Sequence, residues 1–294
     1  MIAKTQPVRP NAVESGLGDA LEWAIQRWVM TTGRKIHAED APWLAGPVGG
    51  HRIGAGFYKE YAQEAGLEIV ADDQDAGLLS DFEALAGDAF DPSLVRPEIH
   101  DFYERTALHK LEVQAEWSKV FRHPPKTLIY LVSRNIQQLN LPGSSGDAGM
   151  SSEVIRLTNP ATGTTPYAGW LRRSRSTGGV IYAGFYTTCE LPGRGGQVVK
   201  VVFPLPDGSA TVVLRPENRQ DGSLALVSGG DGFGDAGYYR VHRGPDGTLR
   251  VKYMPVKEEI QVYVDSEGTL RTGHTLALWK IRFLTLRYEI SRRD

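Results

Sequence analysis

The sequence has very little cysteine and no long hydrophobic run. Its single cysteine, Cys189, excludes an intrachain disulfide and lies in the apolar stretch Phe185–Leu191, which is typical of a small core residue. The first 15 residues contain no apolar segment of the kind found in secretory signals. The longest apolar runs, 128–132 and 198–205, are too short or too interrupted to span a bilayer. These absences predict a cytoplasmic protein without a membrane span.

An excess of basic residues is also missing. The formal net charge is −2, whereas nucleic-acid-binding proteins usually carry a large positive excess, so we expect no nucleic-acid partner. The charge is unevenly distributed: residues 1–118 hold 10 Lys and Arg against 20 Asp and Glu, and residues 119–294 hold 23 against 15. This asymmetry indicates two parts that dock on each other, or arginines in the second part that hold an anionic ligand.

Motifs for metals, nucleotides and activated nucleophiles are absent as well. The seven histidines show no H-x-H or H-E-x-x-H spacing, and the sequence contains neither a P-loop nor a G-x-S-x-G elbow. Gly232, Gly234 and Gly237 match G-x-G-x-x-G, but the residues that follow have the pattern of a strand instead of the helix that a dinucleotide site requires. A calcium site at Asp231 and Asp235 lacks the tandem repeats of such motifs. We therefore predict no metal and no cofactor.

What is present first is an α-rich N-terminal part, residues 1–140. Helical spacing predicts helices at 15–30, 57–66, 78–85 and 128–139, and Pro97 has the position of a first-turn proline in a further helix. Within this part, residues 111–118 alternate between apolar and polar side chains, which favours a strand at 109–118 that joins the sheet of the second part over the alternative of a continuing helix. The Gly- and Ser-rich stretch 141–152 is a candidate linker.

Residues 151–294 have the two-residue period of β-structure, interrupted by turn sequences such as Pro245-Asp246-Gly247. The predicted strands are 152–157, 166–173, 179–190, 197–204, 209–215, 222–227, 236–243, 248–254, 257–264, 269–273 and 277–290. So many strands joined by short turns indicate an antiparallel meander that curls or closes. The fold class is therefore α+β, with N-terminal helices packed on a β-barrel or strongly curved sheet as one integrated unit, analogous to lipocalin-like and helix-grip architectures.

The last predicted strand changes its pattern. Its apolar side chains occupy odd positions up to Phe283 and even positions from Leu284 onward. Either a β-bulge lies at 283–284, or the strand is buried on opposite faces at its two ends.

Aromatic side chains with a few charges make up the candidate site. They share strand faces in the β-part, in the manner of a small-molecule cavity lining, although a filled sandwich core has the same composition. The predicted catalytic residues are His242, His274, Tyr238 and Arg215. The predicted ligand-binding residues are Tyr182, Phe185, Tyr186, Arg240, Tyr253 and Trp279.

These residues lead to two hypotheses of function. The first is a protein that binds a hydrophobic small molecule in a β-barrel cavity, with a cofactor-independent cyclase or isomerase of natural-product biosynthesis as its catalytic version. Such chemistry needs only shape, hydrogen-bond donors and a general acid or base. The alternative is a non-catalytic interaction protein whose acidic helical part binds a partner protein.

Overall fold

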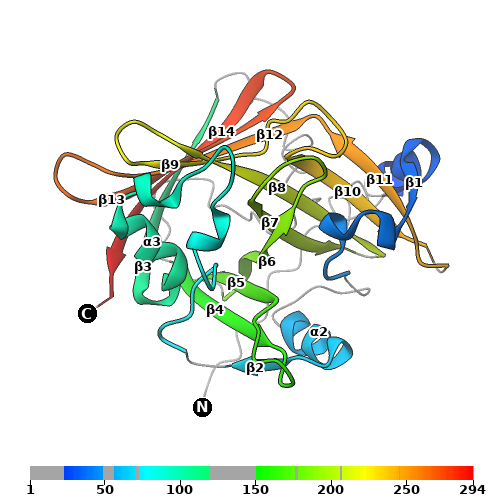
Figure 1. Cartoon of the computed structure of the whole chain (residues 1–294), viewed down its shortest axis with the longest axis horizontal. Helices are drawn as coiled ribbons and strands as arrows, with labels where there is room; N and C mark the ends of the chain where they lie inside the picture. Colours follow the sequence, from blue (N-terminus) through cyan, green and yellow to red (C-terminus); the bar gives the residue numbers. More distant parts are fainter. Residues whose placement is uncertain are drawn as a thin grey trace, which may run out of the picture.

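The computed structural model describes residues 23–48, 56–70, 73–118, 150–175, 178–205, 207–244 and 246–293. Fourteen strands in these ranges belong to one antiparallel sheet (Figure 1). They are β1 (Arg34–His37), β2 (Glu68–Val70), β3 (His109–Trp117), β4 (Met150–Thr158), β5 (Tyr167–Ser174), β6 (Val180–Glu190), β7 (Gln197–Leu205), β8 (Gly208–Asn218), β9 (Leu224–Val227), β10 (Gly237–Arg243), β11 (Thr248–Met254), β12 (Val256–Val264), β13 (Leu270–Leu278) and β14 (Ile281–Arg292).

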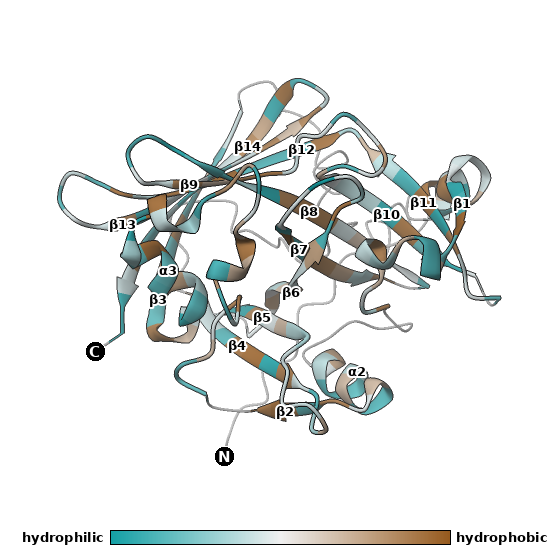
Figure 2. Ribbon diagram, in the orientation of Figure 1, coloured by the Kyte–Doolittle hydropathy of each residue, from teal (hydrophilic) through white to brown (hydrophobic). Residues whose placement is uncertain are grey.

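The predicted meander is correct from β4 to β9, but the sheet then branches. Strand β8 pairs with β10 along Gly208–Val213 and with β9 along Arg215–Asn218. One branch continues through β10 and β11 to β1, and the other through β9, β12, β13 and β14 to β3. Because β8 is longer than either partner, it has room for two neighbours on one edge. Figure 2 shows β7 and β8 as mostly apolar, as expected for central strands buried on both faces.

The predicted antiparallel sheet is confirmed, but it does not close into a barrel. Strands β3 and β4 lie close together where the sheet curls round, but no ladder joins them. Arg293, directly after β14, reaches β4 with its side chain, since its Nη2 donates to the Ser152 carbonyl at 2.7 Å. Part of the edge of β4 that β3 would need for closure is occupied, because β2 pairs with β4 along Arg156–Thr158.

Helices cover parts of the sheet. Residues 23–32 are helical, and two further helices are α2 (Phe57–Ala65) and α3 (Pro97–Glu104). Short 3₁₀ turns are η1 (Ala38–Asp40), η2 (Pro42–Leu44), η3 (Glu83–Leu85), η4 (Pro92–Leu94) and η5 (Thr106–Leu108). Gly66, with φ of +64°, ends α2 at the predicted residue in the left-handed conformation that favours glycine.

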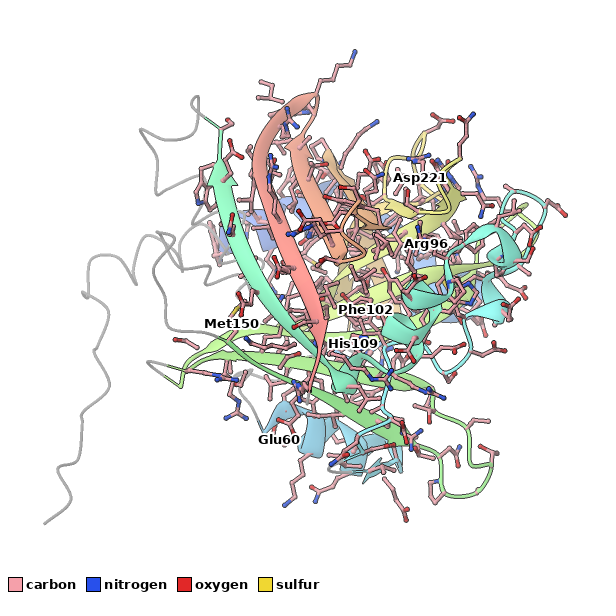
Figure 3. All side chains as sticks on the ribbon, turned by 90° about the vertical axis from the view of Figure 1, so that its left-hand side faces the viewer. Glu60, Arg96, Phe102, His109, Met150 and Asp221 are labelled. Carbon is pink, nitrogen blue, oxygen red and sulfur yellow. The ribbon has the colours of Figure 1, made fainter. Side chains whose placement is uncertain are left out.

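The core has an inner and an outer side. On the inner, concave side, α3 and the segment 76–108 pack against the strands. Phe102 of α3 lies beside His109 at the start of β3 (Figure 3), with ring centroids 5.5 Å apart. On the outer side, α2 packs on β4–β7, and η2 with β1 packs on β8, β10 and β11. The N-terminal part therefore covers both faces of the sheet.

Two finer predictions are confirmed. Strand β3 from the N-terminal part pairs antiparallel with β14 along its whole length. The register between β13 and β14 shifts, so that Leu276 faces Leu284 while Ala277 faces Arg282, which leaves Phe283 as the extra residue of a bulge. Phe283 and Leu284 are both buried, and this explains the change of apolar pattern.

Other predictions need correction. The helix predicted at 78–85 is reduced to η3, because Leu78, Leu79 and Phe82 are buried as an irregular segment against the sheet. The strand predicted at 269–273 continues to Leu278 as β13. The helix predicted at 128–139 and the linker up to residue 149 lie outside the described residues.

Candidate functional site

A cavity of about 80 Å³ lies inside the curled sheet. Inward-facing side chains of ten strands line it, and residues of α3 and the preceding loop close it on the helical side. The lining residues are Leu78, Phe102, Tyr103, Leu111, Trp170, Arg172, Tyr182, Tyr186, Val201, Phe203, Val212, Leu214, Leu226, Tyr238, Val256, Glu258, Ile260, Val262, Thr272, His274, Leu276 and Tyr288. The wall is thus mainly apolar and aromatic, with a few polar groups.

Aromatic rings form one wall of the cavity. Residues 182 and 186 face inward from β6 because side chains four residues apart share a strand face. The Tyr182 hydroxyl donates to the Tyr186 hydroxyl at 2.9 Å. Trp170 packs edge-on against both rings, with centroids 5.5 and 5.7 Å away. Burial raises the pKa of both phenols well above the usual range, so they stay protonated and can act as hydrogen-bond donors.

Arg172 is the unusual residue of this wall. Its side chain comes from β5, is 4% exposed, and lies between the rings of Trp170 and Tyr288, with centroids 5.2 and 5.1 Å from Cζ. Its Nε and Nη2 groups have no hydrogen-bond partner within the described part of the chain. Leaving donors of a buried cation unsatisfied is costly, and cation–π contacts offset only part of that cost. The guanidinium therefore presents free donor capacity at an apolar cavity.

A histidine–carboxylate pair forms part of the opposite wall. His274 of β13 and Glu258 of β12 are inward-facing neighbours, and Nε2 of His274 lies 2.6 Å from Oε1 of Glu258. Their side chains are only 13% and 14% exposed. Because a carboxylate only accepts hydrogen bonds, the contact fixes a proton on Nε2, and the neutral form of this imidazole has its lone pair on Nδ1. Glu258 also raises the pKa of Tyr186, whereas Arg172 lowers it, so both charges act on the same phenol.

Four of the predicted site residues meet in this cavity: Tyr182, Tyr186, Tyr238 and His274. They come from β6, β10 and β13, which the curl of the sheet brings together. Three of the predicted tyrosines and one predicted histidine therefore line the same cavity.

The other six predicted residues lie elsewhere. Phe185 packs against Tyr58 and α2 on the outer side, and the Tyr253 hydroxyl donates to the Gly230 carbonyl at 3.0 Å. Arg215 pairs with Glu217 at 2.7 Å. Arg240 and His242 share the inward side of β10 with Tyr238 but do not line the cavity, and Trp279 is an exposed residue of the β13–β14 turn.

Sequence reasoning missed Arg172 and Glu258. Arg172 could have been found from its position two residues after Trp170 on a mostly apolar strand. Residues two apart share a strand face, so this spacing places a charge on the buried face. Glu258 and Glu259 are neighbours on a strand and therefore point to opposite sides: Glu258 lines the cavity, and Glu259 accepts from Arg219 at 3.2 Å on the outside. Which of the two faced inward was not evident from local sequence.

Comparisons with known proteins give one significant match. No protein-family model matches the chain, and no solved structure matches it significantly. The chain is 26% identical over 271 residues to a Bacillus subtilis (strain 168) protein named "Uncharacterized membrane protein YndJ". The match covers 91% of this chain but only 46% of that protein, so the chain spans about half the length of its relative.

This relative contradicts the predicted cytoplasmic location, because its name places it in a membrane. The absence of a signal segment and of apolar runs was therefore not a sufficient basis for that prediction. In the described ranges, no helix has the length and apolar character needed to cross a bilayer.

Proposed function

We propose that the chain binds an amphipathic small molecule whose apolar body lies in the cavity and whose anionic group contacts Arg172. The observation that carries this proposal is the pairing of a buried arginine that has unused donors with an otherwise apolar lining. A carboxylate or phosphate oxygen would satisfy Nε and Nη2 together, since a guanidinium presents such donors in a fork that matches these groups.

The size of the cavity restricts the apolar body. Pockets for drug-sized ligands usually measure ~300–1,000 Å³, whereas this cavity has about 80 Å³. A slender chain fits such a space better than a fused ring system, and a longer ligand requires lining side chains to move. Tyr182 and Tyr186 are the candidates for this movement, because their mutual hydrogen bond can be exchanged for one to the ligand.

The name of the relative favours a particular source for the ligand. The Bacillus subtilis protein is named as a membrane protein, and membranes are rich in molecules with a slim apolar chain and an acidic head group. We therefore propose a fatty-acid-like or phospholipid-derived amphiphile as the ligand class.

The His274–Glu258 pair supports a second, catalytic candidate. In this hypothesis Nδ1 of His274 removes a proton from a carbon next to a ligand carbonyl, and Arg172 or Tyr186 stabilises the enolate oxygen. Returning the same proton to another carbon gives an isomer, so the reaction is balanced without a cofactor. Glu258 would hold the imidazole orientation and stabilise its protonated form.

The interaction-protein alternative has one supporting feature. Trp23, Trp28 and Met30 on the helix 23–32 are exposed. Their charged neighbours are basic, since Arg27 lies over the Trp23 ring and Lys252 over the Trp28 ring. A surface of this kind does not match the acidic helical face on which that alternative was based.

Binding of cis-parinaric acid, a slim fluorescent fatty acid, tests the main proposal. We expect Arg172→Met to weaken binding about 10- to 100-fold, because charge-assisted hydrogen bonds contribute about 1.5–3 kcal/mol. Arg173→Met, on the neighbouring residue that faces the other side of β5, is the control and should bind normally. The methyl ester of the ligand should bind wild type and Arg172→Met equally. Equal binding of the free acid by both proteins would contradict the proposal, and native mass spectrometry of the purified protein would identify any retained ligand.

A further inference from the structure

The tip of the β13–β14 hairpin exposes two large apolar side chains. Trp279 is 64% exposed and Ile281 is 52% exposed, although most residues of their size in this protein are buried. Figures 1 and 3 show this hairpin projecting at the top of the molecule, with its turn pointing away from the body of the sheet. Neither residue contributes to the cavity wall.

The turn holds Trp279 outward by its backbone conformation. Trp279 and Lys280 form a two-residue turn, and Trp279 has φ of +54°, in the left-handed region that bulky residues avoid. Its N–H donates to the Pro255 carbonyl at 2.7 Å, which ties the turn to the start of β12. An exposed tryptophan at a position that normally favours glycine indicates that the side chain itself is needed there.

Positive charge surrounds these apolar residues. Lys257, Lys280 and Arg282 are all exposed, and no ion pair involves them in the described part of the chain. Ala277 is the cross-strand neighbour of both Lys257 and Arg282, so these two cations lie in one row on the outer face. From residue 277 to residue 288 the sequence contains no acidic residue.

We infer that this hairpin tip docks on the surface of an anionic phospholipid bilayer. Tryptophan favours the interface between head groups and acyl chains, and Ile281 adds apolar area beside it. Lysine and arginine close to the surface are attracted to acidic lipids, and the attraction decreases within a Debye length. A contact of this small area gives weak, reversible and salt-sensitive attachment.

The same charges argue against a second copy as the occupant. A two-fold contact between tips would bring Lys257, Lys280 and Arg282 of one copy against those of the other, and like charges across an interface are repelled. The inference does not depend on the cavity ligand, because the two regions share no residue that either argument uses.

Vesicle co-sedimentation tests the inference with the full chain. We expect wild type to bind vesicles of mixed phosphatidylglycerol and phosphatidylcholine at low salt, and to bind pure phosphatidylcholine at least 10-fold more weakly. The variant Trp279→Gly with Ile281→Thr should lower binding to the mixed vesicles at least 10-fold. Glycine suits the positive φ and threonine suits a strand, so this variant should fold. Lys280→Glu with Arg282→Glu should remove the preference for phosphatidylglycerol.

Trp23→Ser is the matched control, because Trp23 is 61% exposed and the helix 23–32 lies beside β1, away from the β13–β14 turn (Figure 1). It should bind mixed vesicles as wild type does. Equal binding by the hairpin variant and wild type would overturn the inference, as would a wild type that binds neither vesicle. A concentration-dependent dimer in sedimentation velocity that the hairpin variant loses would also overturn it and would assign the tip to a second copy.

Discussion

His274 and Glu258 lie side by side on neighbouring strands, with Nε2 and Oε1 2.6 Å apart in the wall of the cavity. Two residues along β12 and β13, the same inward face carries Val256, Ile260 and Leu276, with Thr272 as a further polar side chain. The pair is therefore a polar contact in apolar surroundings, where each partner depends on the other to satisfy its hydrogen-bonding group.

This dependence predicts a measurable coupling energy. In a double-mutant cycle of Glu258→Gln and His274→Phe, we expect a coupling of about 1–2 kcal/mol in the free energy of unfolding, measured by urea denaturation. The adjacent outer pair, Glu259 and Arg219, is the control: its side chains are 49% and 35% exposed, so its coupling should be below about 0.5 kcal/mol. Similar values for both pairs would show that the inner pair is effectively solvated.

Arg172→Met should separate binding from stability. Removing a buried cation with unsatisfied donors is expected to leave the free energy of unfolding unchanged or to raise it by up to about 2 kcal/mol. Urea denaturation of wild type and variant without added ligand measures this. A loss of more than about 2 kcal/mol would mean that the contacts with Trp170 and Tyr288 give Arg172 a structural role.

Gly169→Ala should disturb the attachment of α2. A Cβ at this position would lie 2.4 Å from Cε1 of Tyr58, whose buried hydroxyl donates to the carbonyls of Trp170 and Gly184 at 3.1 and 3.2 Å. We expect a loss of about 2–3 kcal/mol in the free energy of unfolding, as for other overpacked cores.

Gly273→Ala is the control for this change. No atom lies within 4 Å of its added Cβ, and the backbone φ is not positive. This variant should be neutral or more stable by up to about 1 kcal/mol, because alanine restricts the unfolded chain. Equal effects at both positions would mean that the tight fit of Tyr58 on β5 is not maintained in solution.

His109 should make stability depend on pH. Burial lowers the pKa of His109, although the Arg105 carbonyl, 3.0 Å from Nδ1, and Asp101 both raise it; Arg292 and Arg293 lower it further. The unfolded chain therefore binds a proton more readily than the native protein. The stability contribution is complete above the unfolded pKa of about 6.5 and is lost as the pH falls from there through the lower native value.

The pH dependence can be assigned with His109→Asn, which keeps a donor for the Arg105 carbonyl. Just below pH 6.5, the free energy of unfolding should fall more steeply with decreasing pH for wild type than for this variant. The difference in slope should be up to about 1.4 kcal/mol per pH unit, because wild type binds one additional proton on unfolding. Urea midpoints between pH 7.5 and pH 5 provide the measurement. Parallel curves for the two proteins would show that His109 does not titrate differently on folding.

Local sequence predicted the elements well wherever the period was clear. The strands from β4 to β12, the helices beginning at Phe57 and Pro97, and the strand β3 were all identified from alternation, caps and helical spacing. The bulge at Phe283 was also visible, because an extra residue shifts the apolar phase of a strand. These features depend on neighbours in sequence, and sequence patterns record them directly.

Long-range pairing was harder to predict. The branch at β8 places β10 beside β8 instead of β9, a choice that depends on which edges are free once the other strands have paired. For the same reason, local sequence did not show that Tyr182 and His274 both line the cavity whereas Phe185 lies on the outer side of the sheet. Alternation shows which residues share a face, but it does not show which face is turned inward.

The bulge at Phe283 has a further consequence for how this protein can vary. On the cavity side of the bulge, the phase of β13 and β14 is fixed by the packed wall, and a one-residue shift there would turn Leu286 and Tyr288 out of the core. Between the bulge and the turn, the extra residue separates the phase of the strands from that of the cavity wall. The hairpin tip can therefore change length and composition without altering the register of the wall, so that one pair of strands carries two surfaces free to evolve at different rates.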